Sequence, residues 1–426
     1  MDAERILILG SGGREHALAW RLSRDRGVRE VLCAPGNAGT AELGRNLDLS
    51  PSDVDAVCAA ARAERVDLVV VGPEAPLVDG VVDGLMREGI AAFGPDAAGA
   101  CLEGSKVFAK ELMARHGVPT AGFRVFDDPD AADAHVRAAG RPLVVKADGL
   151  AAGKGVVVAD NAGEALSAID LIMRRRAFGA AGDRVVVEEL LRGQEVSYHV
   201  VSDGRDYVAL APAQDHKRVN DGDRGPNTGG MGAYSPPPVV DAEVERRILR
   251  EVVEPTLAGM AAEGHPFRGA LFVGLMVDDG QPRVLKYNVR FGDPECQTLV
   301  TRWAGDLAPL LMGAARGRLA GVRPVWSAPC SLCVVLAASG YPGHYDEGVV
   351  IAGLEDAAQV PGVTLFHAGT ARAEGRIVTA GGRVLAVTAV GDSVDVAAER
   401  AYRAADRVRF DGKHCRRDIG WRARTP

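Results

Sequence analysis

Three short runs of leucine and β-branched residues near the amino terminus each lead into a loop that contains glycine. They occupy residues 5–10, 31–34 and 68–72, and stretches rich in alanine lie between them. This repeated order of strand, glycine turn and helix predicts a parallel sheet with crossover helices. Because the carboxyl ends of parallel strands meet at one edge of a sheet, we expect the three loops to border one ligand-binding crevice.

The rest of the chain requires further domains. At 426 residues the chain is longer than one hydrophobic core usually organises, since a domain commonly contains roughly 100–200 residues. We expect the first unit to end near residue 100. Beyond about residue 323, several short strands and a final helix predict a smaller α+β domain. The predicted fold class is therefore multidomain, α/β and α+β.

Composition and charge exclude several classes of protein. The net charge of −7 comes from interspersed residues and only 5% of the residues are aromatic, which argues against nucleic-acid binding. No apolar run approaches the length of a membrane span, so no membrane partner is expected. The seven cysteines lie at irregular spacings and read as reduced thiols, which predicts a cytoplasmic protein. Cys330 and Cys333 open an apolar run, and this favours a buried strand over metal or redox use.

The glycine loops of the first domain are the first candidate binding elements. Residues 10–16, Gly-Ser-Gly-Gly-Arg-Glu-His, begin at a strand end and open a helix, where free N–H groups and the helix dipole favour an anion. A plain strand-to-helix turn explains the same motif equally well, and its glycine spacing does not match a dinucleotide fingerprint. Residues 36–39 and 72–77 follow the next two strands in the same way.

Three lysines and a glycine-rich loop form a second candidate element. Lys146 stands inside the apolar strand Leu-Val-Val-Lys-Ala, where a charge without a partner is costly. Lys154 lies in the glycine-rich loop at residues 149–155, between two expected strands. Lys106 lies on a helix, and a solvated helix face is the alternative explanation for it. Together the three lysines can meet the charges of a triphosphate, while the loop closes over it and excludes water.

Two polar segments complete the candidate site. Residues 214–238 carry both charge signs and show no periodicity, so we expect an irregular functional loop without secondary structure. Residues 288–295, Asn-Val-Arg-Phe-Gly-Asp-Pro-Glu, gather charges where an apolar strand ends. A polar turn after a buried strand is the alternative, but the clustering favours a functional site.

These motifs, taken in order, resemble those of the phosphoribosylamine–glycine ligase family, the glycinamide ribonucleotide synthetases of purine biosynthesis, in the ATP-grasp superfamily. The likeness covers the whole chain. It rests on the motifs at residues 10–16, 149–155, 225–232, 288–295 and 417–420.

The resemblance implies a domain plan around an ATP-grasp core. The amino-terminal parallel α/β domain would span residues 1–101, and the carboxy-terminal domain would span residues 324–426. The central ATP-grasp domain would comprise residues 102–122 and 189–323, with a lid subdomain at residues 123–188. The cofactors would be ATP and Mg²⁺ or Mn²⁺. Glycine, 5-phosphoribosylamine and ATP would bind to a monomer.

The resemblance also assigns roles to individual residues. Lys106 and Lys146 would hold the ATP phosphates, and Lys154 would lie on the closing loop. Glu188 and Leu191 would border adenine, and Glu195 would meet the ribose hydroxyls. The nucleotide-binding set would be Lys106, Lys146, Gly153, Lys154, Gly155, Glu188, Glu189, Leu191, Glu195 and Arg290. The set that holds glycine and phosphoribosylamine would be Gly12, Gly13, Arg14, Glu15, Gly36, Asn37, Gly39, Pro73, Glu74, Asp215, Lys217, Asn227, Thr228, Gly229, Gly230 and Asp293. The catalytic residues would be Arg290, Lys154 and Asp215, and Asn288 would bind the metal.

One position departs from the family pattern. The pattern has Glu-x-Asn before Arg290, with both side chains binding magnesium, but this chain has Lys286 at the glutamate position. A lysine carries no anionic oxygen for a hard cation. Three explanations stay open: an engineered or accidental change disables the site, another carboxylate such as Asp293 or Glu295 replaces the ligand, or the ammonium supplies part of the metal's charge. We favour reduced activity on an intact fold.

The implied reaction has two steps. The glycine carboxylate attacks the γ-phosphoryl group of ATP to give glycyl phosphate, and the amine of 5-phosphoribosylamine then displaces phosphate. Neither step requires a covalent enzyme intermediate, and the sequence shows no nucleophile paired with a base. One alternative is another ATP-grasp carboxylate–amine ligase, which the motif at residues 226–232 disfavours. The other is an inactive homologue that binds nucleotide, which only Lys286 supports.

Overall fold

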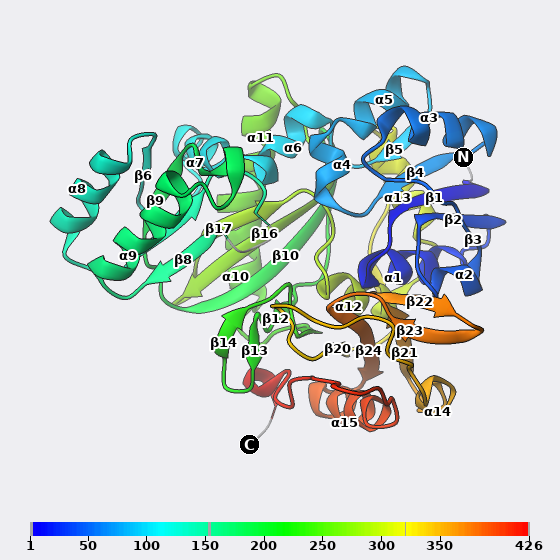
Figure 1. Ribbon diagram of the computed structural model, residues 1–426. Coiled ribbons are helices and arrows are strands. Elements are labelled where there is room, and N and C mark those ends of the chain that lie inside the picture. The colour runs from blue at the N-terminus through cyan, green and yellow to red at the C-terminus, as the bar shows by residue number, and fades with distance from the viewer. Residues whose placement is uncertain (1–2, 152–154, 320, 425–426) are drawn as a thin grey trace.

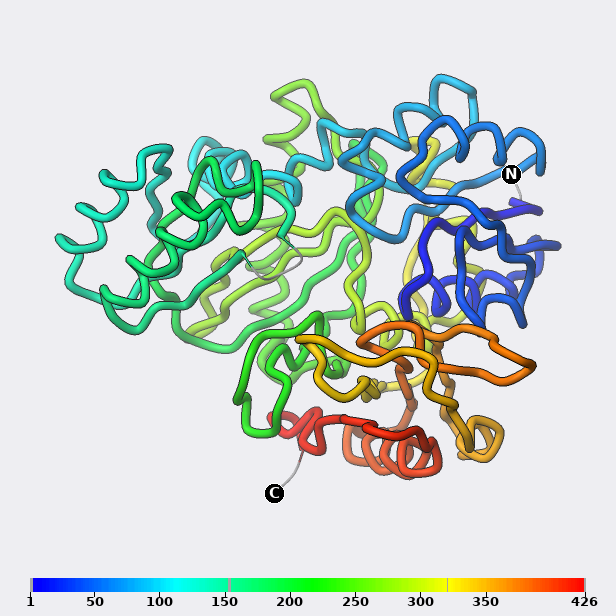
Figure 2. Tube along the Cα trace, viewed as in Figure 1, coloured from blue at the N-terminus to red at the C-terminus, as the bar shows by residue number. Residues whose placement is uncertain are grey.

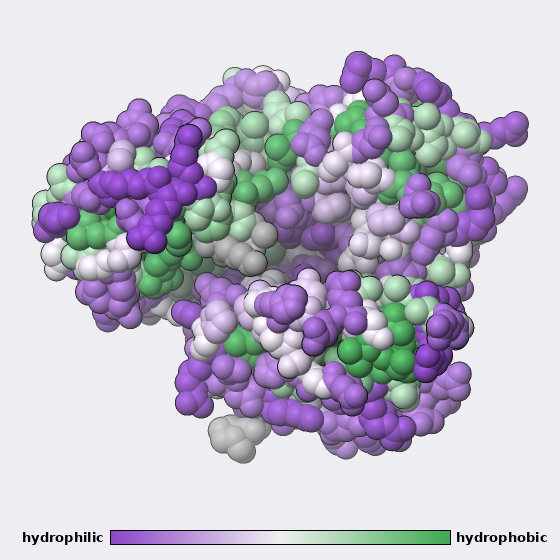
Figure 3. All heavy atoms as spheres, in the orientation of Figure 1, coloured by the Kyte–Doolittle hydropathy of each residue, from purple (hydrophilic) through white to green (hydrophobic). Residues whose placement is uncertain are grey.

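The structure is a computed structural model, and it describes residues 3–151, 155–319 and 321–424. In Figure 1 the amino-terminal lobe is at the upper right, the lid at the left and the carboxy-terminal lobe below, and the space-filling view in Figure 3 shows a central hollow between these three lobes. Hydrophilic surface is visible in this hollow between the lobes (Figure 3). The two ends of the chain lie on different lobes (Figure 2). Among the residues described, no helix combines the length and apolar character that a membrane span needs.

The amino-terminal lobe contains the predicted parallel sheet, with the strand order β3-β2-β1-β4-β5. Its central strand is buried on both faces, because Leu7 and Leu9 pack in one hydrophobic cluster and Ile6 and Ile8 in another. The short strands β3 and β5 were not predicted. The strands are β1 (Arg5–Gly10), β2 (Glu30–Pro35), β3 (Arg45–Asn46), β4 (Leu68–Val71) and β5 (Ala91–Phe93). The helices are α1 (Gly13–Leu22), α2 (Thr40–Leu43), α3 (Val54–Ala63), α4 (Glu74–Val78), α5 (Val81–Arg87) and α6 (Ala97–Gly104).

The lid is an antiparallel sheet of order β6-β9-β7-β8. The expected strand pair around the glycine-rich loop is confirmed, since β7 and β8 pair from Leu143 with Ala159 to Lys146 with Val156. Residues 152–154 lie outside the described residues, and the predictions for Gly153 and Lys154 lie outside with them. The strands are β6 (Phe123–Phe126), β7 (Leu143–Ala147), β8 (Val156–Ala159) and β9 (Val185–Glu189). The helices are α8 (Pro129–Ala139) and α9 (Ala162–Ile169), followed by the helical turns η1 (Asp170–Arg174) and η2 (Gly179–Gly182).

The central sheet has the order β11-β10-β16-β17, and it forms the floor between the lid and the amino-terminal lobe (Figure 1). Helix α7, the helix expected to carry Lys106, leads into the lid, and its N-cap Ser105 accepts a hydrogen bond from Phe108 N. The strands are β10 (Gln194–Asp203), β11 (Tyr207–Ala209), β16 (Arg268–Asp278) and β17 (Gln281–Asn288). The helices are α7 (Lys106–Arg115), α10 (Ala242–Arg247), η3 (Ile248–Val253), α11 (Glu254–Ala262), α12 (Glu295–Arg302) and α13 (Ala308–Ala315).

The expectation that residues 214–238 lack secondary structure is wrong. Four short strands lie in this segment: β12 (Gln214–Asp215), β13 (Arg218–Asn220), β14 (Arg224–Asn227) and β15 (Gly232–Ser235). Because β15 pairs with β20, the segment joins the carboxy-terminal sheet, whose order is β12-β15-β20-β24-β21. Strands of two to four residues are too short to show a period in the sequence.

The carboxy-terminal lobe completes the fold and confirms the predicted mixture of α/β and α+β units. Helix α15 covers its main sheet and packs against β20 and β24. The strands are β18 (Trp303–Ala304), β19 (Val325–Trp326), β20 (Cys330–Ala337), β21 (Val363–His367), β22 (Thr370–Ala373), β23 (Arg376–Thr379) and β24 (Arg383–Gly391). The helices are α14 (Leu354–Ala358) and α15 (Val394–Ala405), with a final turn η4 (Trp421–Ala423).

Candidate functional site

The glycine loop before α1 folds around its own carboxylate. Glu15 Oε2 accepts a hydrogen bond from Gly12 N at 2.6 Å. Gly10 has a φ of +120°, and a Cβ atom there would lie 2.7 Å from Glu15 Cγ, so only glycine fits. The Glu15 side chain thus holds the turn. The substrate contacts predicted for Gly12 and Gly13 would come from backbone groups.

The first and fourth motifs meet in the structure. Arg14 N donates to Asp293 Oδ2 at 3.2 Å, and Arg14 Nη1 donates to Phe291 O at 2.9 Å. Gln297 Nε2 and Arg383 Nη1 lie 3.0 and 3.3 Å from Asp293 Oδ1. Burial raises the pKa of Asp293, but the charges of Arg383 and Arg14 outweigh burial and hold this pKa below its ordinary value. Asp293 is therefore an ionised anchor between lobes.

Asn37 fixes the second glycine loop. Its Oδ1 accepts a hydrogen bond from Gly39 N at 2.9 Å, and Gly36 lies directly before it in the chain. Its Nδ2 donates to Ser11 O at 2.8 Å and to His367 O at 2.9 Å. One amide therefore links the two glycine loops to the carboxy-terminal lobe.

Arg290 is held by two carboxylates from the amino-terminal half. Its Nε donates to Glu74 Oε2 at 3.1 Å, and its Nη2 donates to Glu103 Oε1 at 2.9 Å. Pro73 is the N-cap of α4, so Glu74 begins that helix. Burial raises the pKa of Glu74, but the charges of Arg290 and Arg14 outweigh burial and hold this pKa below its ordinary value. The carboxylate therefore stays ionised. A phosphate at Arg290 would have to share the guanidinium with these ion pairs.

Lys146 and Lys110 share one buried carboxylate on the lid side of the hollow. Lys146 Nζ lies 2.8 Å from Glu188 Oε1, and Lys110 Nζ lies 3.0 Å from Oε2. Only 2% of the Glu188 side chain is exposed. Lys106 differs, because its Nζ donates to the carbonyl of Gly149 at 2.7 Å. One carboxylate therefore faces two lysines, while the third lysine contacts only a neutral oxygen among the described residues.

Burial and the neighbouring positive charge of Lys146 lower the pKa values of Lys106 and Lys110. Burial, with the charge of Lys146, lowers the pKa of Lys106 to about 8. Burial lowers the pKa of Lys110 to about 8 as well, although Glu188 opposes the shift. Such a cluster is costly unless an anion joins it. The lid side of the hollow is therefore suited to a polyphosphate.

Three other residues predicted to bind nucleotide lie at the ends of the lid strands β8 and β9. Gly155 precedes β8, and Glu189 Oε1 accepts a hydrogen bond from Gly122 N at 3.0 Å. Leu191 follows β9 and is partly exposed. Both oxygens of Glu188 are engaged by lysines, so its place beside adenine stays a prediction.

The acceptor side of the hollow is built from residues 214–230, which we call the acceptor segment. Lys217 Nζ lies 2.9 Å from Asp215 Oδ1 and also contacts Glu195, so predicted substrate and nucleotide residues meet here. Burial lowers the pKa of Lys217, but the charges of Asp215 and Glu195 raise it above its ordinary value. Thr228 N donates to Lys217 O at 2.8 Å and thereby closes the segment on itself.

The far end of the acceptor segment contacts the fourth motif. Asn227 ends β14, and the next residues approach β24, where Arg383 Nη1 donates to Gly229 O at 2.9 Å. Gly230 has a φ of +119°, and a Cβ atom there would lie 2.5 Å from Pro294 Cδ. Glycine is therefore required where the segment passes the fourth motif.

Lys286 lies on β17, and its charge interacts with those of Lys217 and Arg290 in the candidate site. Its side chain is exposed, and among the described residues no hydrogen bond or ion pair holds its Nζ. The Nζ atom lies 5.4 Å from the centroid of the Phe272 ring. The surrounding walls of protein reduce its hydration, and with the charges of Lys217 and Arg290 they lower its pKa.

Family models match most of the chain. The N domain of phosphoribosylglycinamide synthetase matches residues 4–103, its ATP-grasp (A) domain residues 104–296 and its C domain residues 331–422. The chain belongs to the phosphoribosylglycinamide synthetase family. A curated relative, the phosphoribosylamine–glycine ligase of Vibrio cholerae, is 51% identical over 98% of both chains.

Solved structures agree with this assignment. The crystal structure of phosphoribosylamine–glycine ligase from Thermotoga maritima has a TM-score of 0.86 at 36% identity, and the match covers 98% of this chain and 100% of that chain. The biotin carboxylase domain of 2-oxoglutarate carboxylase from Hydrogenobacter thermophilus has a TM-score of 0.74 at 16% identity, over 97% and 92% of the two chains. At that identity, the second likeness shows the fold alone.

The metal ligands of the phosphoribosylglycinamide synthetase pattern are only partly present. Asn288 Oδ1 is buried without a hydrogen-bond partner among the described residues, which suits a ligand, but Lys286 offers no lone pair while charged. Of the proposed substitutes, Asp293 is held by arginines and Glu295 accepts a hydrogen bond from a serine hydroxyl at 2.8 Å. In the described part of the chain, no group of three or more His, Cys, Asp or Glu is arranged to hold a metal. This donor set does not fit the family's metal site.

Sequence reasoning missed three residues of this synthetase site. Glu103 accepts hydrogen bonds from Asn288 Nδ2 and from Val289 N, the latter at 2.8 Å. Lys110 and Arg383 were also missed. Glu103 lies three residues before Lys106, and an acidic residue so close to a phosphate lysine was the available clue. Arg383 gave no local clue, because its contacts with Asp293 span 90 residues.

Arg416, directly before the terminal motif at residues 417–420, acts with that motif to hold the acceptor segment. Arg416 is fully buried, its Nε and Nη2 donate to Asp418 at 2.7 and 2.8 Å, and its Nη1 donates to Asp223 at 2.8 Å. Gly420 N donates to His216 Nε2 at 3.0 Å. Arg416 and the terminal motif together therefore fix the β13–β14 hairpin and His216, the residue between Asp215 and Lys217.

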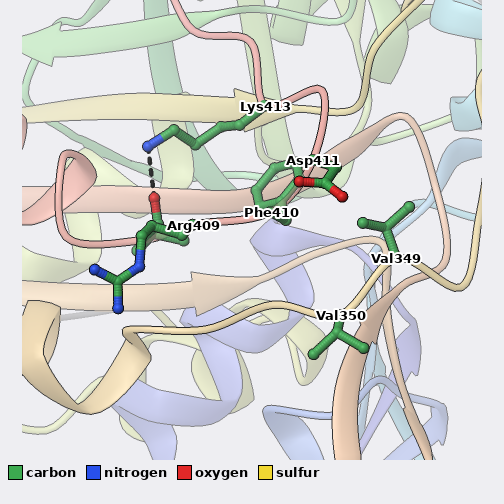
Figure 4. Close-up of a pocket in the computed structure, with 7 residues that line it drawn as sticks. Val349, Val350, Arg409, Phe410, Asp411 and Lys413 are labelled. Carbon is green, nitrogen blue, oxygen red and sulfur yellow. Dashed lines mark hydrogen bonds between the residues drawn. The ribbon is translucent and has the colours of Figure 1, made fainter.

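A separate hollow of about 550 Å³ lies on the carboxy-terminal lobe between Val349–Val350 and residues 408–413 (Figure 4). Lys413 Nζ donates to Val408 O at 2.5 Å and to Ala405 O at 2.8 Å, so its ammonium caps the end of α15. None of the predicted substrate or nucleotide residues that the structure describes lines this hollow. It is distinct from the synthetase site.

Proposed function

We propose that the chain joins glycine to 5-phosphoribosylamine while converting ATP to ADP and phosphate, the second step of de novo purine biosynthesis. The proposal rests on the 51% identity with the ligase of Vibrio cholerae over 98% of both chains. The hollow supports it, because cations gather on the lid side and the acceptor segment lies opposite. The cations suit the triphosphate of ATP, and the acceptor segment is proposed to hold glycine and the amine substrate.

Lys106 and Lys146 are the proposed phosphate-binding groups. Glu188 neutralises only one of Lys110 and Lys146, and Lys106 has a neutral partner, so net positive charge remains for the triphosphate. ATP and Mg²⁺ or Mn²⁺ are the proposed cofactors, and the Hydrogenobacter carboxylase domain forms a crystalline complex with the magnesium salt of ADP. Because the donor set around Lys286 does not fit the family's metal site, the steps below rely on protein groups alone.

In the first proposed step, a glycine carboxylate oxygen attacks the γ-phosphorus of ATP, the bond to the β-phosphate oxygen breaks, and glycyl phosphate and ADP form. The protein's contribution is positioning and charge neutralisation, because no covalent enzyme intermediate is needed. Arg290 is proposed to stabilise the charge that develops on the transferred group. Lys154, outside the described residues, is proposed to close over it.

In the second proposed step, the amine of 5-phosphoribosylamine attacks the acyl carbon and phosphate leaves. Burial raises the pKa of Asp215, but Lys217 outweighs burial and keeps this pKa below its ordinary value. An ionised Asp215 can accept a hydrogen bond from the amine and orient it. The glycine loops around Arg14 and Asn37 are proposed to hold the phosphoribosyl part.

Several finer features belong to the same proposal. We propose a cytoplasmic monomer with the domain boundaries given above. We also propose that Lys286 reduces the rate below that of a chain with glutamate at this position. An inactive homologue that only binds nucleotide is the second candidate, and Lys286 is the observation that favours it.

Glycine- and phosphoribosylamine-dependent release of ADP tests the proposed function. We expect release only when both substrates are present. When phosphoribosylamine is left out and hydroxylamine is added, we expect glycine hydroxamate, because hydroxylamine traps an acyl phosphate. ATP binding without glycine-dependent ADP release would instead identify the inactive homologue.

A further inference from the structure

The residues of β16 beside Lys286 leave room for an extended lysine side chain. Opposite it on β16 is Gly274, and a Cβ atom there would lie 3.0 Å from Lys286 Cγ. Two residues earlier on the same strand, Phe272 places its ring 5.4 Å from the ammonium nitrogen. The stem of the lysine therefore crosses a glycine, and its charge rests over an aromatic ring. Both features keep the side chain extended, and its exposed Nζ stays accessible to a ligand.

Lys286 also differs from its basic neighbours in how its charge is balanced. Lys146 is paired with Glu188, and Lys217 is paired with Asp215. Among the described residues, Lys286 has no such partner. Glu103 and Asp215 attract the Lys286 ammonium without forming an ion pair with it, so its charge is well placed for an anionic ligand.

The position of Lys286 indicates which part of the ligand it meets. Its charge interacts with that of Lys106 on the nucleotide side. It also interacts with Lys217 and Asp215 on the acceptor side. The charge of Lys286 therefore acts on both sides of the site, and its strand β17 leads directly into the fourth motif.

We propose that the Lys286 ammonium binds the terminal phosphates of a nucleoside triphosphate and supplies there part of the positive charge that the family pattern draws from a metal ion. This role deepens the proposed function and rests on it. A covalently held ammonium does not dissociate as a metal ion does. Nucleotide binding by this chain therefore depends less on divalent cations than binding by a chain with glutamate at position 286.

Equilibrium binding of AMP-PNP, an ATP analogue that resists hydrolysis, tests the proposal. Calorimetry would measure its affinity in EDTA and then across a Mg²⁺ titration, with glycine and phosphoribosylamine absent. Lys286→Met keeps the stem and removes the charge, and Lys286→Glu restores the carboxylate of the family pattern. Arg246→Met is the matched control, because it removes one positive charge from a side chain that is 63% exposed on α10.

In EDTA we expect Lys286→Met to weaken AMP-PNP binding by about 10- to 100-fold, the range of one charge-assisted hydrogen bond. We expect Lys286→Glu to bind weakly in EDTA and to recover with Mg²⁺, more steeply than the unchanged chain. The Arg246→Met control should stay within about twofold of the unchanged chain. Equal affinity of the unchanged chain and Lys286→Met in EDTA would overturn the proposal.

Two further readouts keep the result interpretable. Lys286 is exposed, so both variants should melt at nearly the temperature of the unchanged chain, and Lys286→Met alone decides the matter should Lys286→Glu fail to fold. Glycine-dependent ADP release is measured separately. Charge-dependent AMP-PNP binding without that release would contradict the ligase function and still support the role of Lys286.

Discussion

The basic side chains on the two sides of the central hollow differ in how the protein balances their charge. On the lid side, Lys110 and Lys146 contact the two oxygens of buried Glu188. On the floor of the hollow, Lys286 is exposed and has no carboxylate partner among the described residues. Lys110 and Lys146 are thus paired before any ligand arrives, whereas the charge of Lys286, like that of Lys106, is left for the ligand. Four changes probe this difference.

The largest expected effect is on stability, from Glu188→Gln. This change leaves two buried lysines without a counter-charge, and breaking such a pair typically costs about 3–5 kcal/mol. We expect urea denaturation to show a fall of about that size in the free energy of unfolding. Glu189→Gln, at a partly exposed neighbour, and Lys286→Met should each cost less than about 1 kcal/mol. Similar losses for all three variants would remove the distinction between the two sides.

The second effect is on turnover, from Lys286→Glu. If the glutamate restores a metal ligand beside Asn288, glycine-dependent ADP release in saturating Mg²⁺ should rise by about 10²-fold, or ~2.7 kcal/mol of barrier. Steady-state kinetics over a range of Mg²⁺ concentrations would measure the change. Equal turnover of the two chains would mean that another group carries the ion.

The third effect concerns the acceptor segment, which Arg416 fixes much as Glu188 fixes the lid lysines. Arg416→Lys cannot reproduce the contacts to Asp223 and Asp418 together, because it loses the guanidinium fork. We expect the KM for phosphoribosylamine to rise by about tenfold, while AMP-PNP affinity stays unchanged. Arg417→Met, at a side chain that is 53% exposed, is the control and should change neither value by more than about twofold. A parallel loss of nucleotide affinity would show that Arg416 supports the whole fold and not this segment.

The smallest effect is a pH dependence that comes from Lys106. Its pKa of about 8 means that the free enzyme loses this charge as the pH rises through 8. The protonated fraction falls about threefold between about pH 7.5 and 8.5, so ADP affinity should fall by about the same factor. Lys106→Arg stays charged and should flatten the profile, although Lys110 titrates in the same range. A profile that Lys106→Arg leaves unchanged would assign the titration to another group.

The sequence predicted the parts of this site that leave a local trace. Lys146 stood out because a charge inside an apolar strand is costly, and β7 indeed carries it. The glycine loop at residues 10–16 stood out because it joins a strand to a helix, and the structure has β1 and α1 there. Both inferences needed only neighbouring residues.

The parts that the sequence did not reveal depend on register and on distant pairing. Glu188 reaches Lys146 because β9 pairs with β7 in one particular alignment. Lys286 has room for its stem because a one-residue irregularity in the β16–β17 ladder sets it against Gly274. Residues 214–238 show no period because their strands are short: β13 pairs with β14, and β12 pairs with β15, whose other partner β20 lies beyond the fourth motif in the chain.

The pairing of β15 with β20 and the clamp of Arg416 also set an order of events during translation. A ribosome delivers the acceptor segment well before its sheet partner, and Arg416 follows Asp223 by 193 residues. The nascent chain can assemble the parallel sheet early, but its acceptor segment waits for strands that have not yet emerged. Because both halves of the catalytic hollow must be present for the coupled reaction, activity should appear in a single step, late in synthesis, with no half-active intermediate.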